Sequence, residues 1–152
     1  MSAFITEGTL YLFNTFMGMF EPVLFNGNIV SASSDEDNRT VCFIDSNNDL
    51  WARGPNSDGL LGLIGVNKTL EFVRVPINFK VKRVVCMSYC TFVIDVDGNI
   101  WYTGHVWTLR ARIFTQLTQN IVFIDIASGG GNIFGVDING DLWGYGQASH
   151  WN

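Results

Sequence analysis

The sequence is poor in charged side chains, and above all in basic ones. Only 15% of its 152 residues are Asp, Glu, Lys or Arg, and nine basic residues against fourteen acidic ones give a formal net charge of -5. Broad binding to a phosphate backbone depends on clustered Lys and Arg. The composition therefore argues against nucleic acid as a partner.

The sequence also lacks the marks of an exported or membrane-spanning chain. The first thirteen residues have no basic start and carry Glu7, and the longest early uncharged run, Gly8 to Phe20, is interrupted by Asn and Gly. A membrane-spanning helix needs about 20 apolar residues, so we expect no membrane span and no signal peptide. Three cysteines are an odd count, which is typical of reduced thiols. We expect an intracellular protein, with cytoplasm, nucleus and virion left undistinguished.

Motifs for catalysis and cofactor binding are missing. The chain has two histidines, His105 and His150, and contains no P-loop, no G-x-S-x-G and no G-x-G-x-x-G. Gly129-Gly130-Gly131 could approach a phosphate, but a strand-like segment follows it where a phosphate cradle needs a helix N-terminus. We therefore expect no enzyme activity, no cofactor and no small-molecule substrate.

Large apolar side chains are plentiful. The chain is 47% hydrophobic and 14% aromatic, with 12 Phe and 5 Trp. A chain of this length can bury roughly two thirds of its unfolded surface, so we expect one packed domain over residues 1–152. No window of 11 or more residues keeps a helical period. The expected fold class is all-β.

An internal repeat organises the chain. Residues 44–54, 94–104 and 136–146 align without a gap. Their shared pattern begins with an aliphatic residue, Asp and any residue. Asn or Asp, then Gly or Asn, then Asp or Asn follow, and the pattern ends with Leu or Ile, Trp, any two residues and Gly. Residues 4–14 form a fainter copy, with Tyr11 in the Trp place. The aromatic positions are 40, 50 and 42 residues apart, which is the period of propeller blades.

Each copy has the sequence of a tight hairpin. Asp97-Gly98 and Asn139-Gly140 suit the two central positions of a type I′ turn, and Asn47-Asn48 is the next best choice. We predict hairpins near residues 4–14, 43–54, 93–104 and 135–146, each preceded in the three clear copies by an apolar strand. A two-residue turn places three pairs opposite each other: Ile44 and Trp51, Ile94 and Trp101, Val136 and Trp143.

The repeat resembles that of the regulator of chromosome condensation (RCC1) family of β-propellers. Residues 50–63, 84–104 and 125–146 carry the resemblance, which includes one trailing G-x-N-x-x-G-x-L-G over residues 54–62. The family usually has Gly and, three residues later, His before the hairpin strand. Here those places hold Asp37 and Thr40, Met87 and Cys90, or Gly129 and Asn132. Since most of the family's residues are replaced, we do not assign the family's activities to this chain.

The chain is short for a closed propeller. A mean spacing of 44 residues between the aromatic positions gives about 3.5 repeats, whereas closed propellers have roughly four to eight blades. We therefore expect a partial or oligomer-completed β-propeller of about three to four RCC1-like blades. Its uncovered end faces predict self-association or docking of a protein partner.

Several residues are predicted to be structural. We expect the repeated indoles to pack between blades, and the repeated Asp and Gly residues to shape the turns: Trp51, Trp101, Trp143, Asp45, Asp95, Asp137, Gly98 and Gly140. The D-x-[DN]-G runs differ from a calcium-binding EF-hand loop, which has Gly at position 6 and Glu at position 12. Cys86 and Cys90 would lie about 13 Å apart on a straight strand, too far to share zinc, although a turn at residues 87–89 could close that gap. No metal site is expected.

Two groups are candidate binding residues. The first is Trp107 with Arg110 and Arg112, a composition favoured at interfaces, for which an ordinary loop anchor is the alternative. The second is Lys80, Lys82 and Arg83, which fall with Lys68 and Arg74 in a 16-residue stretch. A strand with one solvated face gives the same alternation.

The sequence predicts a non-enzymatic β-propeller module for protein–protein interaction or assembly. Short RCC1-like proteins of this kind resemble those encoded by large DNA viruses, and 14 Asn with 12 Phe suits an A/T-rich genome, so the hypothesis includes a viral structural or host-interacting protein. The alternative implied by the resemblance is an RCC1-type regulator acting on a small GTPase or chromatin. A propeller enzyme is the third class.

Overall fold

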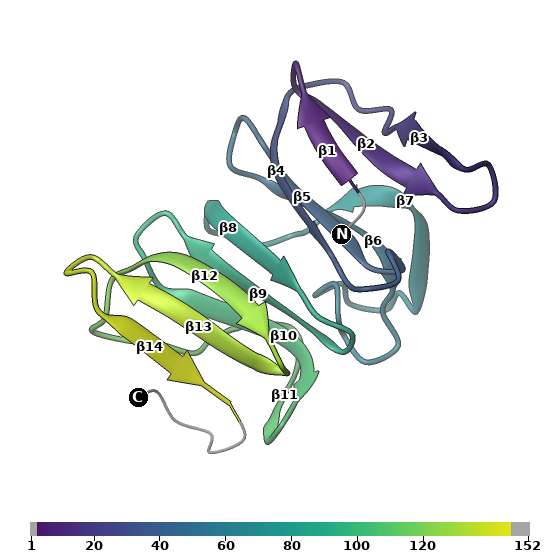
Figure 1. The fold of residues 1–152 in the computed structure, drawn as a ribbon. Coiled ribbons are helices and arrows are strands. Elements are labelled where there is room, and N and C mark those ends of the chain that lie inside the picture. The colour runs from purple at the N-terminus through teal and green to yellow at the C-terminus, as the bar shows by residue number, and fades with distance from the viewer. Residues whose placement is uncertain (1–2, 147–152) are drawn as a thin grey trace.

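The computed structural model describes residues 3–146, which form fourteen strands and no helix (Figure 1). The strands make four antiparallel sheets, numbered here in chain order. The all-β prediction is confirmed. No helix long and apolar enough to cross a membrane occurs in this part of the chain. His150 lies outside the described residues.

Sheets 2 and 3 have four strands each, and sheets 1 and 4 have three within residues 3–146. Sheet 1 contains β1 (Ala3–Thr6), β2 (Thr9–Asn14) and β3 (Met19–Pro22). Sheet 2 contains β4 (Ile29–Ser34), β5 (Val41–Asp45), β6 (Leu50–Pro55) and β7 (Lys68–Arg74). Sheet 3 contains β8 (Val81–Cys86), β9 (Cys90–Asp95), β10 (Ile100–Val106) and β11 (Leu109–Gln116). Sheet 4 contains β12 (Phe123–Gly129), β13 (Asn132–Asp137) and β14 (Leu142–Tyr145).

The sheets follow one another in space as they do in sequence, and sheets 1 and 4 lie at opposite ends of the array (Figure 1). The first strands of sheets 2, 3 and 4 contact one another: β4 touches β8, and β8 touches β12. These inner strands line one side of the array. Three apolar cores lie between neighbouring sheets, and the largest joins sheets 2 and 3 around Ile44, Leu50 and Val93.

The hairpin turns differ from the prediction. Ile44 pairs with Leu50, and Trp51 pairs with Phe43. The Asp45 N–H donates to the Asp49 carbonyl, so the loop between these two residues holds three residues, 46–48. Only the third of them has a positive φ: 61° at Asn48, 91° at Gly98 and 85° at Gly140. This geometry is a type I turn followed by a bulge residue. The two-residue type I′ turn, and with it the three predicted cross-strand pairs, is wrong for these copies.

The first hairpin keeps the two-residue turn. Glu7 and Gly8 both have positive φ, at 49° and 75°. Phe4 lies opposite Tyr11, so the cross-strand pairing expected for a two-residue turn occurs in this copy.

The repeated Asp accounts for the difference between the first hairpin and the others. Ile5 stands where the other copies have Asp. In those copies one carboxylate oxygen accepts two hydrogen bonds from the turn. Asp45 Oδ1, for example, accepts from the backbone N–H groups of Asn47 and Asp49, at 2.9 and 3.0 Å. The carboxylate thus stabilises the longer loop, which the first hairpin lacks.

Each turn also holds the next sheet in place. The N–H of the first inner-strand residue donates to the carbonyl of the last turn residue of the sheet before: Ile29 to Gly8, Val81 to Asn48, and Phe123 to Gly98, at 2.8, 2.8 and 2.9 Å. The same bond at all three junctions fixes the stacking. It also shows that the first hairpin occupies the same place in sheet 1 as the others do in theirs.

A matched pair of glycines tests this stacking. A Cβ on Gly98 would lie 2.6 Å from Val122 Cγ1 and 3.1 Å from the backbone of Phe123, whereas a Cβ on Gly140 meets nothing within 4 Å. Both substitutions to Ala incur the strain of positive φ, about 1 to 2 kcal/mol. We expect Gly98→Ala to cost about 1 to 3 kcal/mol more than Gly140→Ala, because it also overpacks a junction. Urea unfolding of both variants measures the difference, and equal losses would contradict the stacking.

Candidate functional site

The repeated Asp and Trp residues form one hydrogen-bonded unit in each of the last three hairpins. The indole Nε1–H of Trp51 donates to Asp45 Oδ2 at 3.0 Å, and the corresponding distances are 2.8 Å for Trp101 and Asp95 and 2.9 Å for Trp143 and Asp137. The other carboxylate oxygen accepts two turn N–H groups each time. The sequence analysis missed the indole bond, although the constant six-residue spacing from Asp to Trp could have indicated it.

The three indoles are half-buried rather than enclosed. Each faces the preceding sheet: Trp101 stacks on Phe79 at 4.3 Å between ring centroids, and Trp51 meets Phe25 edge-on at 5.0 Å. The indole N–H must reach the turn at the end of the sheet, so part of the ring stays near the surface. The indoles therefore pack between sheets with one edge exposed.

The cysteines are buried in the packing between strands. Burial raises the pKa of the Cys90 thiol to about 12, and a hydrogen bond with Cys86 followed by burial raises the pKa of Cys42 well above its usual value. Thiols held protonated in this way are poor nucleophiles and poor metal ligands. Within residues 3–146 no three His, Cys, Asp or Glu side chains gather as a metal site would need.

The basic candidates are distributed among ion pairs. Lys80 Nζ lies 2.7 Å from Asp49 Oδ1, and Arg74 lies 3.2 Å from the same oxygen. These two cations hold the pKa of Asp49 below its ordinary value. Arg83 pairs with Asp125 at 3.4 Å and also donates to the carbonyl of Lys82. The structure therefore does not bring Lys80, Lys82 and Arg83 together as a patch of uncompensated positive charge.

Trp107 lies at the tip of the β10–β11 hairpin with a φ of 51°. Its ring packs 5.4 Å from Tyr145 and 6.5 Å from Phe92, which makes it an anchor between sheets 3 and 4. Arg110 and Arg112 are exposed on β11, where Arg112 donates to the Ser57 carbonyl at 3.1 Å. Trp107 also lines a cavity of about 800 Å³ at the ends of the inner strands, together with His105, Met87, Tyr89 and Glu36.

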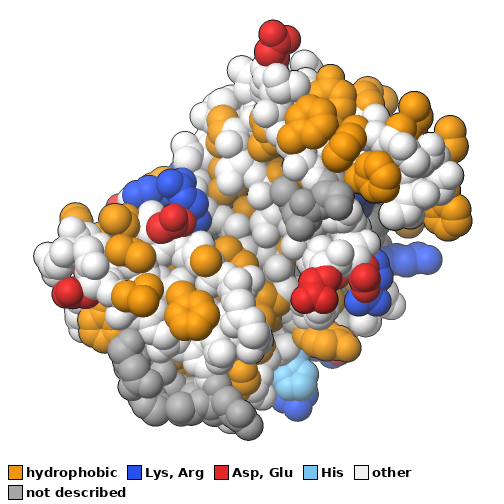
Figure 2. All heavy atoms as spheres, viewed as in Figure 1, with side chains coloured by type: hydrophobic (Ala, Val, Ile, Leu, Met, Phe, Trp, Pro, Cys, Tyr) orange, Lys and Arg blue, Asp and Glu red, His pale blue; other side chains and the backbone are white. Residues whose placement is uncertain are grey.

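Exposed apolar side chains gather over both end sheets (Figure 2). On sheet 4, Leu142 is 70% exposed, whereas the residues in the same repeat position, Leu50 and Ile100, are 1% and 0% exposed. Phe134 is 40% exposed, and its counterpart Phe92 is fully buried. The positions that face a following sheet are thus apolar in sheet 4 as well, where no described strand covers them.

Aromatic rings cover the opposite end of the array. On sheet 1, Phe4 stacks on Tyr11 at 4.9 Å, and Phe20 meets Phe4 and Phe13 edge-on at 5.0 and 5.2 Å. Phe4 and Phe20 are each 45% exposed. Tyr11 occupies the place of the repeated Trp, which elsewhere faces the preceding sheet. The two ends of the array therefore present the two halves of the junction that the internal sheets form with each other.

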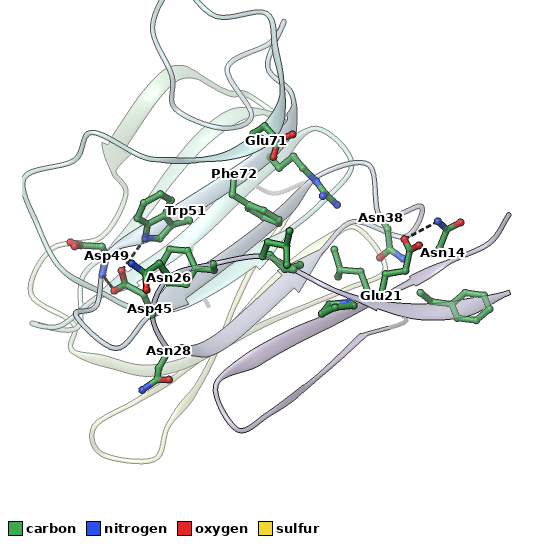
Figure 3. Close-up of a pocket in the computed structure, with 18 of the residues that line it drawn as sticks. Asn14, Glu21, Asn26, Asn28, Asn38, Asp45, Asp49, Trp51, Glu71 and Phe72 are labelled. Atoms are coloured by element: carbon green, nitrogen blue, oxygen red, sulfur yellow. Dashed lines mark hydrogen bonds between the residues drawn. The ribbon is translucent and has the colours of Figure 1, made fainter. Parts of the chain in front are cut away.

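An open groove of about 870 Å³ lies between sheets 1 and 2. Trp51 and Phe72 line it from sheet 2 (Figure 3), and Leu12 lines it from sheet 1. The linker from residue 23 to residue 28 contributes Phe25. The sequence analysis did not identify this groove, because its lining comes from three separate segments of the chain.

Comparisons with known proteins identify the fold. No family model matches the chain, and no curated protein matches it. Among solved structures, human WBSCR16 is 16% identical over 85% of this chain and 36% of that one, with a TM-score of 0.72. Prp20p from Saccharomyces cerevisiae is 15% identical over 78% of this chain and 32% of that one, with a TM-score of 0.65.

The similarity at this level of identity concerns the fold alone. A structure of Kap60 bound to yeast RCC1 (Prp20) also matches, at 16% identity and a TM-score of 0.70, over 92% of this chain and 40% of the other. The chain spans about a third of the length of the first two structures and two fifths of the third. The predicted fold, an RCC1-like partial β-propeller, is confirmed.

The Asp–Trp unit yields a stability prediction. Asp95→Ala removes the acceptor for the indole of Trp101 and for the N–H groups of Asp97 and Asn99. We expect a loss of about 2 to 4 kcal/mol in the free energy of unfolding, because three part-buried donors lose their shared acceptor. Asp97→Ala is the control, because its side chain is exposed, and should change stability by less than about 0.5 kcal/mol. Urea unfolding measures both, and similar losses in the two variants would contradict the role of Asp95.

The same unit predicts acid sensitivity. The hydrogen bond from Trp143, followed by backbone N–H bonds, lowers the pKa of Asp137 below its ordinary value. A carboxyl whose pKa is lowered in the folded state stabilises that state at pH values above its unfolded pKa of about 3.9. Unfolding followed from pH 7 to pH 2 should show this stability being lost as the pH falls through the folded-state pKa of Asp137. Asp137→Asn should flatten that loss, and an unchanged acid profile would contradict the prediction.

Proposed function

We propose that this chain is a non-enzymatic β-propeller module that works through protein–protein contacts at the outer faces of sheets 1 and 4. The observation that carries the proposal is the exposure of Leu142, set against the burial of Leu50 and Ile100 in the same repeat position. A second copy of the chain is the proposed occupant. Sheet 4 of one copy would meet sheet 1 of the other as neighbouring sheets meet within the chain.

Symmetry favours a closed pair. Two copies supply twice four sheets, which is within the roughly four to eight blades of closed propellers. A head-to-tail contact that closes gives a ring, and one that does not gives a fibre. Each junction would bury on the order of several hundred Å² of apolar surface, about 10 kcal/mol at 25 cal/mol per Å². A ring of two forms two such junctions for one loss of translational freedom, which costs about 4 to 15 kcal/mol.

A regulatory role is the second candidate. The solved structure of Prp20p concerns binding to Gsp1p and histones, and its fold is shared by this chain. We infer a small GTPase or chromatin partner only as the alternative, because the net charge of -5 and the ion pairs of Lys80 and Arg83 leave little positive charge for nucleic acid. A viral structural or host-interacting setting is the biological context that we propose for the assembly role.

The mass of the native assembly tests the proposed function. We expect native mass spectrometry and analytical ultracentrifugation at micromolar concentration to give a simple multiple of 17.0 kDa. Leu142→Lys should shift the protein to monomer, because a charge would be buried at the junction. Leu70→Lys is the control, because Leu70 is 78% exposed on β7 away from both end faces, and should leave the mass unchanged. A wild-type monomer, or the same mass for both variants, would contradict the proposal.

A further inference from the structure

The three junctions between sheets differ in what fills their outer part. Between sheets 2 and 3 the filler is the β6–β7 loop, residues 56–67, here named the plug loop. Its leucines Leu60, Leu61 and Leu63 are 3%, 1% and 8% exposed and pack in the same core as Phe114. The plug loop thus completes this junction.

Specific contacts hold the plug loop. Asn56 donates its side-chain amide to the carbonyls of Leu63 and Val66, at 2.6 Å each, and accepts from the Leu61 N–H at 2.9 Å. Thr103 on sheet 3 donates to the Gly59 carbonyl at 2.6 Å. The trailing G-x-N-x-x-G-x-L-G motif is therefore the sequence of a loop that inserts leucines between two sheets.

The other two junctions have no such loop. Between sheets 3 and 4, Trp107 from the shorter β10–β11 turn packs against Tyr145 instead. Between sheets 1 and 2, the β2–β3 connection is the tight turn Thr15–Gly18, closed by a bond of 2.8 Å from the Gly18 N–H to the Asn14 carbonyl. Phe16 in that turn is 99% exposed, so the turn does not fold back over the junction. The groove of about 870 Å³ occupies the outer part of this junction.

The floor of the groove matches the surface on which the plug loop sits. Phe72 and Phe114 occupy the same repeat position, each two residues before the partner of the repeated Trp. Phe114 is 8% exposed beneath the plug loop, whereas Phe72 lines the open groove and is only half-buried. Trp51 and Phe25 continue the apolar floor, as Trp101 and Phe79 do at the next junction.

The rim of the groove is acidic. Glu21 and Glu71 line it and are exposed, whereas two further lining carboxylates are ion-paired: Asp37 with Arg39, and Asp49 with Lys80 and Arg74. Arg53 is the one Lys or Arg among the described lining residues, and its guanidinium lies over the Phe72 ring, 4.7 Å from the centroid. A segment entering the groove would therefore meet an apolar floor and a negatively charged edge. Leucines would complement the apolar floor, and flanking basic residues would complement the negatively charged edge.

We propose that the groove between sheets 1 and 2 binds an extended, leucine-bearing segment of a protein partner with basic residues at its ends. The segment takes the place that the plug loop occupies one junction further along. This inference rests on the proposed function as a protein-interaction module, but it uses a different surface from the end faces. The volume lies within the roughly 300 to 1,000 Å³ of typical ligand sites.

A peptide copied from the chain is the probe. It carries residues 55–68 with a Lys added at each end, and its control has Leu60, Leu61 and Leu63 replaced by Ser. Fluorescence anisotropy with the full chain should show saturable binding of the first peptide, weakened about tenfold or more in the control. Equal binding of the two peptides, or no binding of either, would overturn the inference.

Variants of the protein locate the binding. Phe72→Ser should weaken the leucine peptide about tenfold, whereas Val73→Ser, on the opposite face of the same strand and outside the lining, should not. Glu71→Lys changes only an exposed rim charge and should also weaken binding, so the test does not depend on a variant that disturbs packing. Unchanged affinity in both Phe72→Ser and Glu71→Lys would place the peptide elsewhere and overturn the inference.

The result of the peptide-binding experiment can be distinguished from the result of the assembly experiment. Leu142→Lys lies on the outer face of sheet 4 and should bind the leucine peptide as the wild type does. Peptide binding by a protein that is a monomer would refute self-association and support the groove. An assembled protein that binds the two peptides equally would support self-association and refute the groove as a leucine-binding site.

Discussion

The structure depends on one carboxylate in each of the last three repeats. One of its oxygens accepts two N–H groups of the turn, and the other accepts the indole N–H six residues later. In sheets 2 and 3 the carbonyl of the third turn residue accepts a hydrogen bond from the first strand of the next sheet, and Gly8 of sheet 1 makes the same bond without an Asp in its turn. A single Asp therefore links the shape of the hairpin to the orientation of the Trp. Sheet 1, with Ile5 in that place, has a two-residue turn and no indole.

The four sheets of residues 3–146 do not close into a ring, and two features of these residues accompany this. The residues that face a neighbour in the middle of the array remain apolar at its ends, as Leu142 and Phe4 show. The outer part of each junction must also be filled, and the chain does so with the plug loop at one junction and with Trp107 at another. The junction between sheets 1 and 2 keeps an open groove. Both features point to contacts with other protein surfaces.

Repeats predicted most of the fold, because each copy carries its own turn and strand residues. The hairpin register was mispredicted, because the dipeptide Asp97-Gly98 suits two turn types and the choice depends on the Asp95 carboxylate. The basic stretch could not be judged from sequence, because Asp49, which pairs with Lys80, lies 31 residues earlier. The groove was missed because it reflects a short turn between β2 and β3 rather than any motif.

Hydrogen exchange of the indole N–H groups tests the central claim most directly. Resonances assigned through single Trp→Phe variants would report on Trp51, Trp101 and Trp143 in the intact chain. The account predicts slow exchange for all three indoles at neutral pH, because each N–H donates to the carboxylate of its own hairpin. Exchange as fast as that of a solvated indole at neutral pH would contradict it.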